Sequence, residues 1–161
     1  MRILAVDPGS KNIGIALSDP TGTIASPLGV VAHVSRPADA AAIAALAHEH
    51  RAGRIVVGQA LDEHGEPTFE GRRAARLAAA IRLQTPLPVE LWDESFTTHD
   101  ARAARAALGS PQRKRRGHLD ELAAAIILQS YLDAHRKDGP GDNDHPNGGE
   151  DNPGPTPQKS P

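Results

Sequence analysis

The strongest constraint on the fold is an apolar strand near the start of the chain that ends in a carboxylate. Residues 1–7 and 12–18 are two apolar runs separated by a glycine-containing turn, which predicts a β-hairpin. The continuous run Ile3–Val6 is typical of a central strand buried on both faces. Asp7 then places a charge beside the core, which is costly unless a positive group pairs with it. A metal ion is the commonest strong partner for such a charge.

The rest of the pattern predicts an α/β fold. Residues 24–34 form a third expected strand, in which Pro27 indicates a sheet edge or a bulge. Three strands followed by helix-linked strands predict a mixed five-stranded sheet with helices on both faces, in the order β-β-β-α-β-α-β-α-α. The other expected elements are a helix at about 38–51, a strand at 54–58, a polar loop at 59–67, a helix at about 68–83, a strand at 89–93, a helix at about 98–107, a basic loop at 109–117 and a helix at about 118–135.

The last expected helix has the clearest apolar periodicity. Asp120 falls in its first turn, on the side of Ala123, Ala124 and Ile127, so we expect its carboxylate at the margin of the buried face. The small residues there would let the helix approach the sheet closely. The apolar stripe predicted to face the sheet is Leu119, Leu122, Ala123, Ile126 and Ile127.

Composition separates the chain into a domain and a tail. We expect one folded domain at 1–137 and a disordered tail at 138–161, because the tail has almost nothing to bury. The tail carries five acidic residues and one basic residue, which leaves 17 basic and 15 acidic residues in the domain. The domain is therefore mildly basic and compatible with a nucleic-acid partner.

The chain has no Cys, which excludes disulfides, thiolate catalysis and zinc–thiolate sites. Its start lacks the features of a signal peptide, and no apolar run approaches the roughly 20 residues of a membrane span. We therefore expect a cytoplasmic protein without a membrane partner.

Acidic residues stand at three places, namely after two of the expected strands and at the start of the last expected helix. Asp7 ends the first strand, Asp93 and Glu94 end the strand at 89–93, and Asp120 begins the last helix. Two strand ends and a helix start can bring three carboxylates to one spot, where they repel one another unless cations lie between them. Mg²⁺ and Mn²⁺ prefer such oxygen ligands, and two ions about 4 Å apart can activate water at a phosphodiester.

Each acid taken alone also has an ordinary structural explanation. Asp7 could start an Asx turn at Pro8-Gly9. Asp120 could be a favourable charge in a first helical turn. Asp93 or Glu94 could cap the next helix, a role for which Thr97 and Thr98 compete.

Four motifs give the chain a resemblance to the YqgF family of RNase H-like nucleases, which is also linked to Holliday junction resolvases. The resemblance spans about residues 1–135. Its motifs are Asp7-Pro-Gly9-Ser-Lys11-Asn-Ile-Gly14-Ile-Ala, then Ile55-Val-Val-Gly58 with Gly65 in the following loop, then Asp93-Glu94-Ser-Phe-Thr97-Thr98, and finally Asp120-Glu-Leu-Ala123-Ala124-Ala-Ile-Ile127-Leu128-Gln-Ser-Tyr131.

The resemblance implies an RNase H-like fold and a metal-dependent phosphodiesterase with a two-metal site for Mg²⁺ or Mn²⁺. It implies Asp7, Glu94 and Asp120 as the catalytic, metal-binding acids and Asp93 as a supporting residue. It also links the chain to maturation of the precursor of small-subunit ribosomal RNA. We count Gly9, Thr97 and His118 as further supporting residues.

The chain departs from the family pattern around these acids. Ser95 replaces the usual Arg, Gln59-Ala60 replaces Leu-Pro, and His118 replaces a common Lys. These departures leave the metal site intact but affect expected phosphate contacts and substrate preference.

Basic residues near the acids are candidates for nucleic-acid binding. Lys11 could reach a phosphate or remain solvated. The run Arg113, Lys114, Arg115 and Arg116 precedes the Asp120 helix and would grip phosphates without sequence preference, or form a solvated loop. His118 could shuttle a proton, although a surface role is the simpler interpretation. Phe69 and Phe96 could stack on bases if exposed, but we expect them in the core.

Three functions compete on these observations. The leading hypothesis is a nuclease acting on structured RNA, at the 5′ end of pre-16S rRNA, with resolution of branched DNA as the alternative. A sugar-kinase-like ATPase would need two large lobes, for which one domain leaves no room. A non-catalytic ribosome- or RNA-binding factor would not need three intact acids. Symmetric junction cutting needs a two-fold dimer. We expect a monomer or weak homodimer and therefore place RNA processing first.

Overall fold

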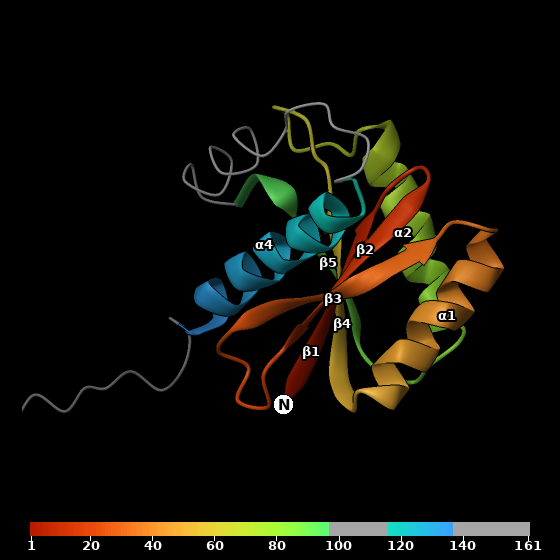
Figure 1. The fold of residues 1–161 in the computed structure, drawn as a ribbon. Helices are drawn as coiled ribbons and strands as arrows, with labels where there is room; N and C mark the ends of the chain where they lie inside the picture. Colours follow the sequence, from red (N-terminus) through yellow and green to blue (C-terminus); the bar gives the residue numbers. More distant parts are fainter. Residues whose placement is uncertain (97–115, 137–161) are drawn as a thin grey trace, which may run out of the picture.

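The computed structural model describes residues 1–96 and 116–136 and shows a five-stranded sheet between two helical layers (Figure 1). The strands lie in the order β3-β2-β1-β4-β5, which confirms the predicted mixed sheet. Their bounds are β1 Arg2–Pro8, β2 Asn12–Ser18, β3 Ala25–Ala32, β4 Ala52–Gln59 and β5 Val89–Asp93. The helices are α1 Arg36–Glu49, α2 Phe69–Arg82, the short 3₁₀ helix η1 Glu94–Phe96, and α4 Arg116–Arg136.

Strand β1 lies in the middle of the sheet, as its apolar run predicts. It pairs antiparallel with β2 and parallel with β4, and β4 pairs parallel with β5. The carboxyl ends of β1, β4 and β5 therefore meet at one edge. Pro27 lies in the edge strand β3 and pairs with Ala16, next to a shift in the pairing register between Ile15 and Ala16. The sheet edge and the bulge that Pro27 indicated are therefore both present.

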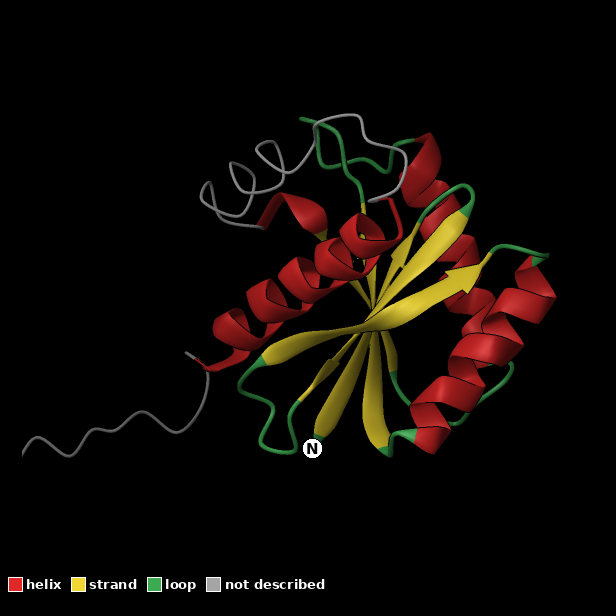
Figure 2. Cartoon of the chain, viewed as in Figure 1, coloured by secondary structure: helices red, strands yellow, loops and turns green. Residues whose placement is uncertain are grey.

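Helices cover both faces of the sheet (Figure 2). Helices α1 and α2 pack on one face, over a core that includes Leu4, Val6 and Ile55. Helix α4 packs on β1, β2 and β3 on the other face, over Ala5 and Val56. Because consecutive strand residues point to opposite faces, the short runs of β1 and β4 supply both cores at once.

The predicted apolar stripe of α4 is partly wrong. The residues that α4 buries are Ala123, Ala124, Ala125, Ile127, Leu128, Tyr131 and Leu132, whereas Leu122 and Ile126 are half-buried. Apolar residues occupy most sides of this helix, so the helical period alone selects no single face. Asp120 lies in line with Ala124 and Ile127 and is itself half-buried, as expected at the margin of the buried face.

Several expectations fall outside the described residues: the helix at about 98–107, most of the basic loop at 109–117 and the tail at 138–161. Helix α4 begins at Arg116, two residues earlier than predicted. None of the helices in the described ranges, 1–96 and 116–136, is both long and apolar enough to cross a membrane.

Candidate active site

Asp7 and Asp120 are brought together by a close contact between β2 and α4. Asp7 pairs with Gly14 across the β1–β2 ladder. A Cβ atom on Gly14 would lie 1.9 Å from the carbonyl oxygen of Asp120, so only glycine permits this approach of the helix backbone. The small side chains of Ala123 and Ala124 extend the contact along the helix. The backbone of Asp120 is thereby fixed directly above the strand neighbour of Asp7.

Glu94 reaches the same edge from β5. It opens η1, and its carboxylate lies over Gly58 near the end of β4. A Cβ on Gly58 would be 3.1 Å from Oε1 of Glu94 and 2.7 Å from Cδ1 of Ile127. The missing side chain at Gly58 therefore makes room for the Glu94 carboxylate between the sheet and α4.

Asp93 holds the turn that carries Glu94. Its Oδ1 accepts a hydrogen bond of 2.8 Å from the backbone N–H of Ser95. This is the bond that an Asx cap makes, so the capping explanation applies to Asp93.

One cavity of about 280 Å³ connects two of the predicted acids. It is lined by Asp7 and Glu94 together with Pro8, Gly58, Ala60, Glu70 and Ala74. Asp120 is not among the lining residues. Within the described ranges, 1–96 and 116–136, no three acidic or histidine side chains form a group that could already hold an ion.

Glu70 is an acid of this cavity that the sequence analysis missed. It lies in the first turn of α2, behind the N-cap Thr68, whose Oγ1 accepts from the N–H of Gly71 at 3.1 Å. An acid in that position is normally explained by the helix dipole. The only available signal was its position in the chain, shortly after the strand ending at Gly58.

The loop that presents Glu70 is held by hydrogen bonds to backbone carbonyls. The side-chain Nε2 of Gln59 donates to the carbonyl of Gly71 at 3.1 Å, and the backbone N–H of Thr68 donates to the carbonyl of Ala60 at 3.1 Å. The start of α2 is thus tied to the end of β4, beside Asp7.

The other predicted residues that the structure describes do not line this cavity. Lys11 is exposed in the β1–β2 turn and does not line the cavity, whereas Gly9 lines a neighbouring one. Arg116 and His118 fall in the first turn of α4, but their side chains are not among those described. Thr97, Arg113, Lys114 and Arg115 lie outside the described residues.

The expectation that Phe69 is a core residue is wrong. Its side chain is 67% exposed, at the first position of α2 and next to Glu70. Residues buried around α2 are instead Ala74, Leu77, Ala78 and Ile81, one helical face that excludes Phe69. An exposed aromatic ring therefore precedes Glu70, an acid of the cavity, in the sequence.

A separate polar cluster holds the sheet to the second half of α4. Glu90 accepts hydrogen bonds from Arg54 at 2.7 Å and from the hydroxyl of Tyr131 at 2.8 Å. Burial and the hydrogen bond to Glu90 raise the pKa of Tyr131 to about 12. Although partial burial opposes it, the bonds from Tyr131 and Arg54 hold the pKa of Glu90 below its usual value.

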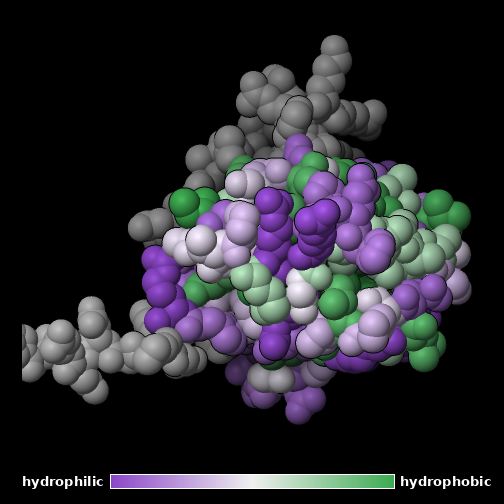
Figure 3. All heavy atoms as spheres, turned by 90° about the horizontal axis from the view of Figure 1, so that it is seen from below, coloured by the Kyte–Doolittle hydropathy of each residue, from purple (hydrophilic) through white to green (hydrophobic). Residues whose placement is uncertain are grey.

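This cluster lies away from the acidic cavity. The rings of Trp92 and Tyr131 meet edge to face with centroids 5.1 Å apart, so the cluster is also packed. Figure 3 shows the end of the molecule opposite the acidic cavity, where apolar side chains are scattered among hydrophilic ones. The candidate site is the cavity lined by Asp7 and Glu94.

Comparisons with known proteins identify the family of the chain. A family model described as "RuvX: Holliday junction resolvase" matches residues 1–134. The chain is 41% identical over 134 residues to a protein of Syntrophus aciditrophicus (strain SB) named "Putative pre-16S rRNA nuclease", covering 83% of this chain and 89% of that protein. A protein of Anaeromyxobacter sp. (strain Fw109-5) with the same name is 41% identical over 133 residues, covering 83% and 97%.

Two solved structures share the fold. The first is "T. thermophilus RuvC in complex with Holliday junction substrate", with a TM-score of 0.53 and 17% identity over 84% of this chain and 96% of that one. The second is a fowlpox virus resolvase with Holliday junction DNA, with a TM-score of 0.50 and 14% identity over 84% and 99%. The expected RNase H-like α/β fold is confirmed. Because the family model spans residues 1–134 and the curated relatives are named as nucleases, the chain belongs to the RuvX family of RNase H-like nucleases.

Proposed function

We propose that the chain is a divalent-metal-dependent nuclease that processes the 5′ end of the 16S rRNA precursor in the cytoplasm. The observation that carries this proposal is the cavity shared by Asp7 and Glu94 at the carboxyl edge of β1, β4 and β5. Ligand and catalytic sites of open α/β sheets lie at this edge. The curated relatives named for pre-16S rRNA support the choice of substrate.

The donor set fits hard divalent cations. Asp7 and Glu94 offer carboxylate oxygens to the cavity, Asp120 is anchored beside Asp7 through Gly14, and Glu70 adds a fourth carboxylate at the wall. Mg²⁺ and Mn²⁺ prefer oxygen ligands, and such ions supply water activation and charge neutralisation at a phosphodiester. We assign Asp7, Glu94 and Asp120 as the ligands.

The remaining residues would bind and orient the nucleic acid. Asp93 keeps Glu94 in place through its bond to Ser95. Lys11 and the basic run 113–116 would contact phosphates, and the exposed ring of Phe69 would stack on a base next to the cleavage point. His118 and Thr97 complete the proposed supporting set.

Resolution of branched DNA is the second candidate. It is favoured by the description of the matching family model as a Holliday junction resolvase. Symmetric cutting of a four-way junction requires two sites related by a two-fold axis, whereas trimming one RNA strand requires one site. We therefore infer a monomer or weak homodimer with RNA as its substrate.

Cleavage assays separate these functions. Labelled 16S rRNA precursor, single-stranded RNA and a four-way DNA junction are incubated with wild type or Asp7→Asn, in Mg²⁺, Mn²⁺ or EDTA. We expect metal-dependent trimming of the rRNA precursor by wild type only. Paired, symmetric nicks in the junction by a dimer would favour the second candidate. Binding without any cleavage would identify a non-catalytic RNA-binding factor and overturn the proposal.

A further inference from the structure

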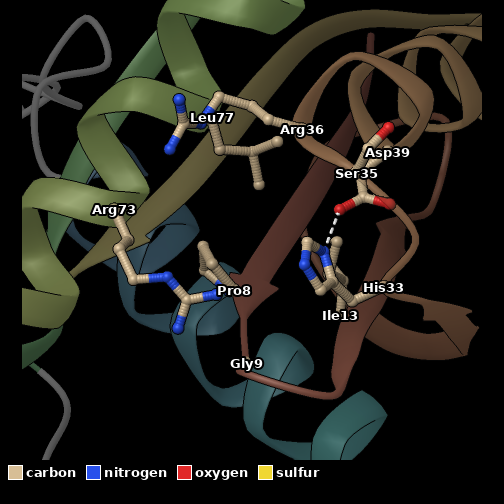
Figure 4. Close-up of a pocket in the computed structure, with 9 residues that line it drawn as sticks. All are labelled: Pro8, Gly9, Ile13, His33, Ser35, Arg36, Asp39, Arg73 and Leu77. Carbon is tan, nitrogen blue, oxygen red and sulfur yellow. Dashed lines mark hydrogen bonds and ion pairs between the residues drawn. The ribbon is translucent and has the colours of Figure 1, made fainter.

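A second cavity lies beside the acidic cavity, on the face of the sheet covered by α1 and α2 (Figure 4). Its volume is about 350 Å³. Pro8 lines both cavities, so the two adjoin at the end of β1. Helix α2 runs along both: Glu70 and Ala74 line the acidic cavity, whereas Arg73 and Leu77 line the second.

Cationic and hydrogen-bonding groups surround this second cavity. Arg73 of α2 extends toward Pro8, and Arg36 lies at the start of α1 (Figure 4). Arg73 is half-buried, and Arg36 is exposed. Neither guanidinium forms an ion pair within residues 1–96 and 116–136. Two guanidinium groups without an acidic partner favour an anionic ligand.

The third group, His33, is held in one orientation by a buried carboxylate. Asp39 is only 3% exposed, and its Oδ2 contacts Nδ1 of His33 at 2.5 Å. The second oxygen of Asp39 accepts from the N–H of Val34 at 3.0 Å. Because a carboxylate only accepts, Nδ1 is the donor, and Nε2 can donate to a phosphate oxygen when both ring nitrogens carry a proton. Each carboxylate oxygen of Asp39 therefore already has a hydrogen-bond partner.

Helix α1 contributes a favourable field at the same point. Its N-cap is Ser35, whose side chain accepts from the N–H of Ala38 at 3.3 Å, and the helix is 14 residues long. Ser35 also lines the cavity, so the positive end of the helix dipole adds to the charges of Arg36 and Arg73.

We propose that this cavity, which we call the Arg73 subsite (Arg73, Arg36, His33 and Ser35), binds a phosphate group of the nucleic-acid strand whose neighbouring phosphate is cleaved beside Asp7. The inference rests on the proposed nuclease function and adds a contact next to the metal-binding acids. A strand that crosses Pro8 passes from one cavity to the other. The subsite therefore fixes the register of the strand relative to the acids, through contacts that carry no sequence information.

The test measures binding in Ca²⁺ or EDTA, by fluorescence anisotropy with single-stranded RNA. Variants are Arg73→Ala, Arg36→Ala and Arg73→Lys, with Arg76→Ala as the matched control, because Arg76 is an exposed residue of the same helix outside the cavity. A charge-assisted contact from a half-buried Arg corresponds to about tenfold in affinity, so Arg73→Ala should weaken binding by roughly that factor. Arg73→Lys should restore part of it, and Arg76→Ala should change affinity less than twofold.

Neutral methylphosphonate linkages placed one at a time along the RNA locate the contacted phosphate. Wild type should bind more weakly when the neutral linkage is at one particular position. Arg73→Ala should bind the RNA with that linkage as tightly as it binds the unmodified RNA. RNAs with and without a 5′-phosphate distinguish an internal phosphodiester from a terminal phosphate. If Arg73→Ala and Arg36→Ala behave like Arg76→Ala while wild type binds and cleaves RNA, the subsite is wrong and the nuclease function stands.

Inorganic phosphate gives an independent measurement. In NMR titrations of the full chain, phosphate should shift the imidazole resonances of His33 in wild type but not in Arg73→Ala. Shifts of His33 without any RNA binding or cleavage would retain an anion site but overturn the nuclease function. The absence of both shifts and RNA binding would overturn both proposals.

Discussion

Replacing Gly14 by Ala would place a methyl group against the backbone of α4. Its Cβ would lie 1.9 Å from the carbonyl oxygen and 2.5 Å from the carbonyl carbon of Asp120. Real Cβ atoms essentially never approach closer than 3.0 Å, so the helix must retreat by about 1 Å. The atoms that obstruct are backbone atoms, which no rotamer change can move aside. The retreat would carry Asp120 away from Asp7.

The consequence for activity should exceed the consequence for stability. Overpacking of this kind costs about 1–3 kcal/mol, which lowers the Tm of a small domain by roughly 4–12 °C and leaves it folded at 25 °C. A displacement of about 1 Å in a catalytic group can cost roughly 100-fold in rate. We therefore expect Gly14→Ala to retain its fold and lose about two orders of magnitude in cleavage rate.

The assay compares single-turnover cleavage at 25 °C with thermal unfolding by circular dichroism. Gly29→Ala is the matched control, because Gly29 is a strand residue of β3 whose added Cβ would meet nothing within 4 Å. The control should keep the wild-type rate. A Gly14→Ala variant with wild-type Tm and rate would refute the argument that this contact positions Asp120.

Three further outcomes follow from other parts of the chain. Phe69→Ala should weaken binding of single-stranded RNA by roughly 5- to 160-fold in anisotropy titrations, since one stacked base corresponds to about 1–3 kcal/mol, with Tm unchanged because the ring is 67% exposed. Replacing Arg113, Lys114, Arg115 and Arg116 by Ala should weaken binding of all substrates alike and reduce its salt dependence; an unchanged salt slope would place the phosphate contacts elsewhere. The pKa of Tyr131 is raised to about 12, above an unfolded value near 10, so its stabilisation is complete below pH 10 and lost as the pH rises through 12. Urea unfolding between pH 9 and 12 should therefore show a fall in stability for wild type that is reduced in Tyr131→Phe, and equal falls would contradict the assignment.

Periodicity predicted the sheet because each strand has a distinct apolar run bounded by a turn or a proline. The run ending at Asp7 and the run ending at Asp93 place their acids at strand ends, and parallel pairing then brings these ends to one edge. This is why Asp7 and Glu94 could be placed near one another from the sequence. Periodicity does not reveal whether Glu94 or Asp93 enters the cavity, which depends on the Asx bond to Ser95; only the family resemblance favoured Glu94.

Features that depend on contacts between distant elements were missed. The buried face of α4 is set by the approach of Asp120 to Gly14, and a helix with apolar residues on most sides gives no periodic signal for it. Glu70 has the sequence context of an ordinary first-turn acid. The exposure of Phe69 follows from the face that α2 buries, which is fixed by packing on β4 and α1.

Metal binding is the most direct test of the central claim that Asp7, Glu94 and Asp120 form the active centre. Mn²⁺ titrations followed by electron paramagnetic resonance should compare wild type with Asp7→Asn, Glu94→Gln and Asp120→Asn. Glu49→Gln is the control, since Glu49 is an exposed acid at the far end of α1, close to the start of β1. The account predicts saturable Mn²⁺ binding that each of the three substitutions weakens and the control does not. Equal Mn²⁺ binding by wild type and all three site variants would contradict it.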